Sequence, residues 1–172
     1  MPVLDPETIN RFAVPVIETV LQAGIEPNEC VVRGGGALAL HGVRPAGHDV
    51  DLVVHPEVFT RLVESRQLAN GVALRWKHPG REDARLISKQ AINDHGLAVD
   101  IMSFLDLPGD QPLKAFEWYF DIAESYPHLS GFVYYASLTQ VKTEKSSSIR
   151  PKDRLDLRRI RKHTETVSSA SI

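Results

Sequence analysis

Segments with helical periodicity alternate along the chain with short runs of branched apolar residues that are typical of strands. Apolar residues recur near the helical period between 9 and 21 and end at Gly24, which predicts a helix that begins at Asp5 and is kinked or split at Pro15. Strands are predicted over 30–33, 50–54, 72–76, 85–89, 97–102 and 131–135. Further helices are predicted over 37–41, 56–66, from 112 onward, 138–145 and 151–162. This mixture predicts an α/β (α+β) fold: a mixed central β-sheet flanked by helices, with C-terminal helices.

The length of 172 residues suits a single compact unit with a helical extension. We expect a core with an N-terminal helix over 1–136, a basic helical segment over 137–163 that packs on it, and a flexible Ser/Thr-rich tail over 164–172. Cys30 is the single cysteine, which excludes an internal disulfide framework and a cysteine-based zinc site. The chain has neither an apolar run of 18 residues nor a start typical of a secretory signal, so we expect a cytoplasmic protein with no membrane partner.

Charge is distributed unevenly along the chain. Nine basic and three acidic residues lie between Lys142 and Lys162, a local charge of +6 that leaves −8 for the rest of the chain. A basic segment on an acidic body suits a phosphate-bearing partner. A solvated basic helix explains the same charges equally well.

Three aspartates interrupt apolar strands. Asp49 and Asp51 are two residues apart and therefore project from one face of the strand over 50–54, and Asp100 lies inside the most apolar strand. An unpaired carboxylate there costs several kcal/mol. A divalent cation, Mg²⁺ or else Mn²⁺, would compensate all three. The alternative is that Asp49 and Asp51 lie at an exposed strand end and that Asp100 pairs with an arginine.

The glycine cluster that follows the first strand offers backbone N–H groups to an anion. Gly34, Gly35 and Gly36 stand between this strand and a helix start, although a flexible loop explains them as well. Gly34 and Gly36 also fit the start of a dinucleotide-binding fingerprint, but that motif requires a longer helix than one ended by Gly42.

Together these motifs resemble the nucleotidyltransferase superfamily of the polymerase-β type. The signature of that family is a Gly-Gly or Gly-Ser pair, about a dozen residues, Asp-x-Asp and a third carboxylate on a later strand. Here 13 residues separate Gly35 from Asp49, and Asp100 follows. The segments around Lys142 and Lys152-Asp153-x-x-Asp156 are similar to the lysine-bearing helix and the Lys-Asp-x-x-Asp motif of the abortive-infection, toxin-like branch.

The resemblance implies a nucleotidyltransferase fold and a magnesium-dependent transfer of a nucleoside monophosphate from an NTP to a hydroxyl, with release of pyrophosphate. Asp49, Asp51 and Asp100 would be the catalytic metal ligands. The nucleotide-binding residues would be Gly34, Gly35, Gly36, Lys142 and Lys152. Arg44 is a further candidate for reaching this site. ATP is the default nucleotide. The resemblance to this branch also implies a role in a toxin–antitoxin system.

No motif in the sequence identifies the acceptor: RNA, a protein and a small molecule are all compatible with it. The sequence does not indicate an oligomeric state either. An alternative function is a catalytically weak or inactive module of the same fold that binds a nucleotide or a protein partner. Gly36, where many family members carry Ser or Thr, favours this alternative, whereas the three aspartates favour the enzyme.

Overall fold

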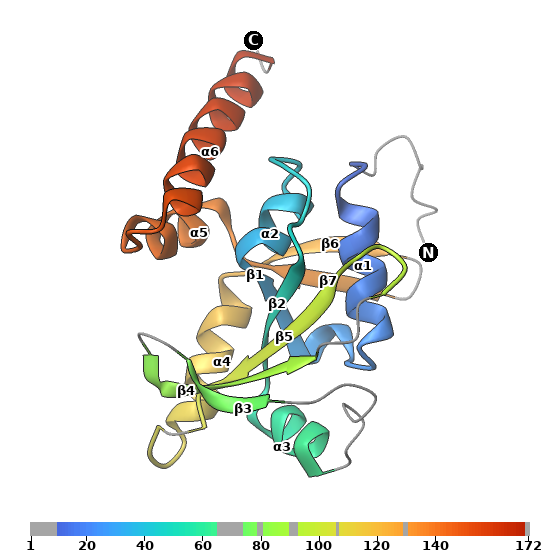
Figure 1. Cartoon of the computed structure of the whole chain (residues 1–172), viewed down its shortest axis with the longest axis vertical. Helices are drawn as coiled ribbons and strands as arrows, with labels where there is room; N and C mark the ends of the chain where they lie inside the picture. The colour runs from blue at the N-terminus through green and yellow to red at the C-terminus, as the bar shows by residue number, and fades with distance from the viewer. Residues whose placement is uncertain are drawn as a thin grey trace.

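A seven-stranded mixed sheet flanked by helices forms the body of the protein (Figure 1), which confirms the predicted fold class. The structure, a computed structural model, describes residues 10–64, 74–78, 81–89, 93–105, 107–128 and 131–170. The strands are β1 (Cys30–Arg33), β2 (Asp49–Val54), β3 (Leu74–His78), β4 (Arg81–Lys89), β5 (Ala98–Ser103), β6 (Glu124–His128) and β7 (Gly131–Tyr135). The helices are α1 (Ala13–Gln22), the 3₁₀ turn η1 (Pro27–Glu29), α2 (Gly34–Leu40), α3 (Pro56–Glu64), α4 (Gln111–Asp121), α5 (Leu138–Ser146) and α6 (Pro151–Ala170).

The order of the strands, β3-β4-β5-β2-β1-β7-β6, brings four strand ends together at one edge of the sheet. Strand β2 runs parallel to β5 and antiparallel to β1, and β1 runs parallel to β7. The first residues of β2 and β5 therefore lie beside the last residues of β1 and β7. At this edge the chain passes from β1 into helix α2 and from β7 into helix α5, which is followed by α6.

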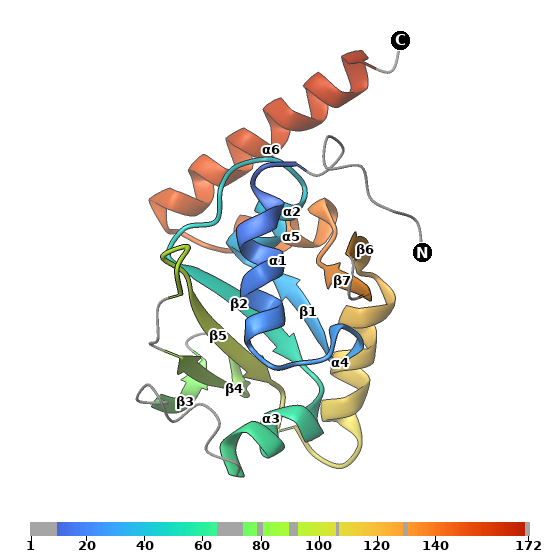
Figure 2. The same ribbon diagram turned by 90° about the vertical axis from the view of Figure 1, so that its right-hand side faces the viewer.

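The two faces of the sheet pack against different helices (Figures 1 and 2). Side chains alternate along each strand, so Val32, Leu52 and Ile101 join the large core that includes residues of α1, α2 and α3. Their neighbours Val31 and Met102 point the other way and pack against α4. The sheet thus has one heavily covered face and one face on which α4 is packed.

The N-terminal helix differs from its prediction. Residues 5–7, its expected start, lie outside the described residues, and α1 runs from Ala13 to Gln22. Pro15 is therefore in the first turn, where a missing N–H breaks no intrahelical hydrogen bond, so the helix need not kink. Helix α2 begins at Gly34 rather than at residue 37 and ends at Leu40, just before Gly42.

The C-terminal third also departs from the sequence prediction. Strand β6 was missed because Glu124–His128 is polar and lacks an alternating apolar pattern. The prediction of a frayed tail from Thr164 is wrong as far as Ala170, where α6 ends. The hydroxyls of Thr164, Thr166 and Ser169 donate to carbonyl oxygens four residues earlier, so these polar side chains find hydrogen-bond partners within the helix itself.

All helices in the described ranges are too short or too polar to cross a bilayer. The sequence also predicts a polar turn at Pro79-Gly80, between the expected strands over 72–76 and 85–89, and this turn lies outside the described residues.

Candidate metal-binding site

The three aspartates converge at the edge where β2 and β5 begin. Asp51 lies opposite Asp100 in the parallel β2–β5 pair, and Asp49 precedes Asp51 by two residues on the same face. One carboxylate oxygen from each lies within 4.8 Å of the others, which is close enough for the three to hold a metal ion. The parallel register of β2 and β5 creates this convergence.

The carboxylates lie on the face that carries α4, but beyond the part that α4 covers. Val53 and Met102 pack against α4 in the second halves of β2 and β5. Asp51 and Asp100 each stand two residues earlier on the same strand and therefore on the same face. Asp49 is exposed and the other two are half-buried, so the cluster is open to solvent on one side.

The electrostatics of the cluster favour a cation. Partial burial raises the pKa of Asp51 to about 6, and the negative charges of Asp49 and Asp100 add to the increase. Arg33 and Lys152 act in the opposite direction. A bound divalent cation removes this repulsion, and oxygen-only carboxylate ligands suit hard ions such as Mg²⁺.

Gly34 allows the end of β1 to approach the carboxylates closely. Its φ of +57° is in the left-handed region, and a Cβ at this position would lie 2.8 Å from Asp51 Oδ2. A Cβ at Gly35 would lie 3.3 Å from Arg44 Nη2, so the arginine covers this glycine. Gly34 therefore lies beside a carboxylate of the site, and Gly35 lies beside Arg44.

A Cβ at Gly36 would point into the core, away from the carboxylates, and the nucleotide-binding role of this residue stays a prediction. It is buried, and a Cβ there would lie 2.8 Å from Val32 Cγ1 and 3.3 Å from Val50 Cγ1. Glycine is needed at this position because α2 packs closely on the sheet. The absence of Ser or Thr at position 36 therefore reflects core packing and does not argue against activity.

Gly34 and Gly36 are expected to respond differently to substitution by alanine. Gly36→Ala is expected to cost about 1–3 kcal/mol of unfolding free energy by overpacking, and to leave metal affinity unchanged. Gly34→Ala is expected to displace Asp51 and to weaken Mn²⁺ binding, in addition to the cost of the strained backbone. Urea unfolding and Mn²⁺ titration of both variants test this. Equal loss of Mn²⁺ affinity in the two variants would contradict the distinction.

The structure separates the two predicted nucleotide-binding lysines. The charge of Lys152, at the start of α6, acts on Asp51. Lys142 is exposed on α5, and it is not among the charged residues that shift the pKa of Asp51. The lysine of α5 that turns inward is instead Lys145, which is 8% exposed.

Lys145 is the centre of a buried ion-pair network between α5 and α6. Its Nζ lies 2.7 Å from Asp153 Oδ1 and 2.8 Å from Asp156 Oδ2, and both aspartates are almost fully buried. Arg44 donates two hydrogen bonds to Asp156, at 2.6 and 2.8 Å. The acidic residues of the Lys-Asp-x-x-Asp segment thus anchor α6 to α5 and to the loop before β2. Arg44, a candidate for reaching the site, is engaged in this anchor.

Sequence reasoning missed a second polar cluster beside the carboxylates. Arg33 lies opposite Asp51 in the antiparallel β1–β2 pair, and its Nη2 donates to Glu144 Oε2 at 3.1 Å. The hydroxyl of Tyr119 donates to the other oxygen of Glu144 at 3.2 Å. Glu144 and Arg33 are 111 residues apart in the chain, and no motif links them.

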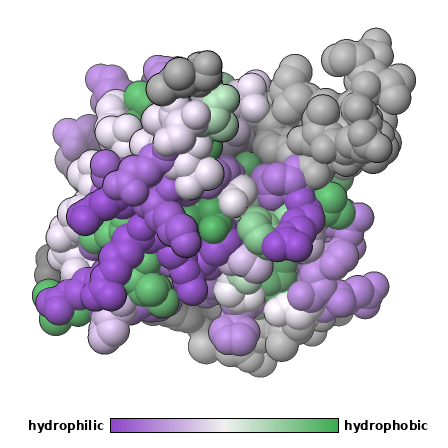
Figure 3. All heavy atoms as spheres, turned by 90° about the horizontal axis from the view of Figure 1, so that it is seen from above, coloured by the Kyte–Doolittle hydropathy of each residue, from purple (hydrophilic) through white to green (hydrophobic). Residues whose placement is uncertain are grey.

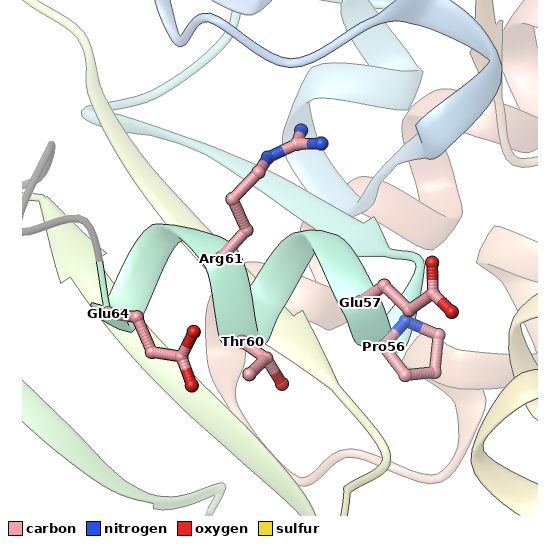
Figure 4. Close-up of a pocket in the computed structure, with 5 residues that line it drawn as sticks. All are labelled: Pro56, Glu57, Thr60, Arg61 and Glu64. Carbon is pink, nitrogen blue, oxygen red and sulfur yellow. The ribbon is translucent and has the colours of Figure 1, made fainter.

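A pocket elsewhere on the surface is unrelated to this site (Figure 4). It is lined by residues of a single helix, α3: Pro56, Glu57, Thr60, Arg61 and Glu64. Helix α3 follows the end of β2, whereas the carboxylates stand at its beginning. Arg61 is already paired with Glu29 at 3.1 Å. The carboxylate cluster is therefore the stronger functional candidate.

Comparisons with known proteins place the chain at a distance from characterised families. No protein-family model and no curated protein matches it. Among solved structures, the crystal structure of JHP933 from Helicobacter pylori is similar, with a TM-score of 0.44 and 17% sequence identity. The alignment covers 95% of this chain and 69% of that one. A likeness at this level establishes no family, and function has to be inferred from the site.

Proposed function

We propose that this protein is a divalent-metal-dependent nucleotidyltransferase, which moves a nucleoside monophosphate from an NTP to a hydroxyl acceptor and releases pyrophosphate. The convergence of Asp49, Asp51 and Asp100 on an open part of the sheet carries this proposal. The approach of Gly34 to Asp51 supports it, because this places a strand-to-helix turn next to the carboxylates. A module that only binds a protein gains nothing from three mutually repelling carboxylates.

The reaction forms a bond between the acceptor oxygen and the α-phosphorus and breaks the bond from that phosphorus to the oxygen shared with the β-phosphate. Mg²⁺ or Mn²⁺ held by the three aspartates would neutralise phosphate charge and lower the pKa of the acceptor hydroxyl. By the resemblance, Asp100 would be on the acceptor side and would take the hydroxyl proton. Most of the catalysis then comes from positioning and from charge neutralisation.

The triphosphate is placed on the Gly34–Gly35 side of the carboxylates. The main chain at Gly34, the first residue of α2, can approach a phosphate closely there because this residue carries no Cβ, whereas Arg44 lies over Gly35. Lys152 supplies a positive charge from α6, and its effect on Asp51 supports its nearness to the bound nucleotide. The exposed Lys142 has no comparable support, so Lys152 is the preferred phosphate-binding lysine.

The surface of α6 favours RNA over a protein as the acceptor. The two aspartates of its first half, Asp153 and Asp156, are buried, whereas its basic residues face solvent. The exposed basic residues are Lys152, Arg154, Arg158, Arg159, Arg161 and Lys162. Figure 3 views the end of the molecule from which α6 projects and shows hydrophilic side chains gathered there. Exposed cations along a helix suit the phosphates of a polynucleotide.

The test is nucleotide transfer by the purified protein with Mg²⁺ or Mn²⁺. Each of the four NTPs, labelled on the α-phosphate, is incubated with a structured RNA that has a free 3′ hydroxyl. We expect label on the RNA with one preferred nucleotide. The matched controls are the same RNA with a blocked 3′ end and the same NTP labelled on the γ-phosphate, neither of which should give labelled RNA.

Two outcomes would contradict parts of this proposal. Label on the protein itself, with none on RNA, would reject the RNA acceptor and retain the transferase. Folded protein that binds no nucleotide in the presence of either metal would reject the transferase altogether and favour the partner-binding module.

A further inference from the structure

We propose that Glu144 is a positioning residue that holds the guanidinium of Arg33 away from Asp51 and so keeps this carboxylate available for a metal ion. This inference rests on the metal-binding part of the proposed function. It assigns a role to the Arg33–Glu144–Tyr119 cluster, which the transfer reaction itself does not use.

Arg33 is close enough to compete for the carboxylates. It pairs with Asp51 in the antiparallel register of β1 and β2, where side chains directly opposite each other have Cβ atoms roughly 5 Å apart. Val31 and Val53 both pack against α4, so Arg33 and Asp51, two residues away from them, share that face. The side chain is only 14% exposed, so solvent cannot take up its charge.

The guanidinium is nevertheless directed to Glu144 and not to Asp51. Its Nη2 lies 3.1 Å from Glu144 Oε2, and its Nη1 lies 3.5 Å from Met102 Sδ. Glu144 is itself held from the other side by the hydroxyl of Tyr119, at 3.2 Å. Met102 of β5 and Glu144 of α5 thus fix the arginine in one orientation, and Tyr119 of α4 holds Glu144 in place.

The physical consequence is a competition between two carboxylate partners for one arginine. An arginine that loses Glu144 is left half-buried with an unpaired charge, and the nearest acceptors on its face are the aspartates. An ion pair with them would occupy oxygen atoms that a metal ion needs and would repel the cation. Glu144 therefore protects the metal site without touching the metal.

A double-mutant cycle on Mn²⁺ affinity tests this inference, with free Mn²⁺ measured by electron paramagnetic resonance. Glu144→Gln preserves the size of the side chain and is expected to weaken Mn²⁺ binding about tenfold. Arg33→Gln removes the competitor and should bind Mn²⁺ at least as tightly as the wild type. The double variant should match Arg33→Gln, because without the arginine Glu144 has nothing to hold. Glu57→Gln, on the exposed side of α3, is the matched control and should be neutral.

The cycle also separates this role from simple electrostatics. A tenfold loss caused by Glu144→Gln in the Arg33→Gln background would show that Glu144 acts by its own charge and would overturn the proposal. No loss in the wild-type background would overturn it as well. If Glu144→Gln does not fold, Tyr119→Phe, which loosens Glu144, should give a smaller loss that again requires Arg33; an unchanged affinity would count against the proposal.

The failure of this inference differs from the failure of the proposed function. Wild-type protein that binds no Mn²⁺ would reject the metal site and with it both proposals. Mn²⁺ binding with the expected cycle but no nucleotide transfer would reject the transferase alone.

Discussion

Asp51→Asn is expected to abolish nucleotide transfer and, at the same time, to stabilise the metal-free protein. Removing the central carboxylate should lower the transfer rate about a thousandfold, because the cation loses the ligand that stands between Asp49 and Asp100. Without metal at pH 8, the same change should raise the unfolding free energy by about 2 kcal/mol. Opposite effects on activity and on stability are typical of a functional site and not of a structural one.

The stabilising effect should depend on pH in a defined direction. The pKa of Asp51 is raised from 3.8 to about 6 in the folded protein, so the folded state binds the proton more tightly than the unfolded chain does. Its contribution is therefore most favourable below pH 4 and is lost as the pH rises through 6. The advantage of the asparagine variant should be full at pH 8 and should shrink between pH 6 and pH 4.

Urea unfolding in EDTA at pH 4, 5, 6 and 8 measures this difference. Asp121→Asn, an exposed aspartate on α4, is the control and should show no pH-dependent gain. With added Mn²⁺ the wild type should overtake the Asp51 variant in stability, because only its site binds the ion well. A variant less stable than the wild type at pH 8 in EDTA would show that Asp51 is a structural residue.

The sequence was sufficient to predict the carboxylate site because its signals are local. Asp49 and Asp51 share a face by alternation alone, and Asp100 was conspicuous in an apolar strand. Their convergence depends on the parallel pairing of β2 with β5, which no local pattern contains. The resemblance supplied only the expectation that the three aspartates belong to one site, and the structure confirms that they converge.

The residues around the site were harder to predict because their partners are distant in the chain. Lys142 and Lys145 both fit a basic helix, and only the packing of α5 against α6 shows that Lys145 is the buried one. Gly36 belongs to a triple glycine whose members are equivalent in sequence, yet a Cβ at Gly36 would meet Val32 whereas one at Gly34 would meet Asp51. Side-chain direction at a strand-to-helix turn is set by backbone geometry, which residue types alone do not specify.

Lys145→Met is expected to be among the most destabilising single substitutions in the chain. It would leave Asp153, which is fully buried, and Asp156 without their shared cation. Breaking one side of a buried ion pair costs about 3–5 kcal/mol, and the remaining arginine partners of the two aspartates place the expected loss near 3 kcal/mol. For a chain of this length that corresponds to a fall in Tm of about 10 °C.

Lys142→Met, on the same helix and with an exposed side chain, is the matched control and should change stability by less than about 0.5 kcal/mol.

Acid titration adds a second test of the role of Lys145. Burial alone would raise the pKa of Asp153, but its three hydrogen-bond donors outweigh burial and lower the pKa to about 2. Its stabilisation is therefore present above pH 4 and lost as the pH falls toward 2, so the difference between the wild type and Lys145→Met should narrow over that interval. Equal losses for the two methionine variants at pH 7 would mean that α5 does not dock on α6 through Lys145.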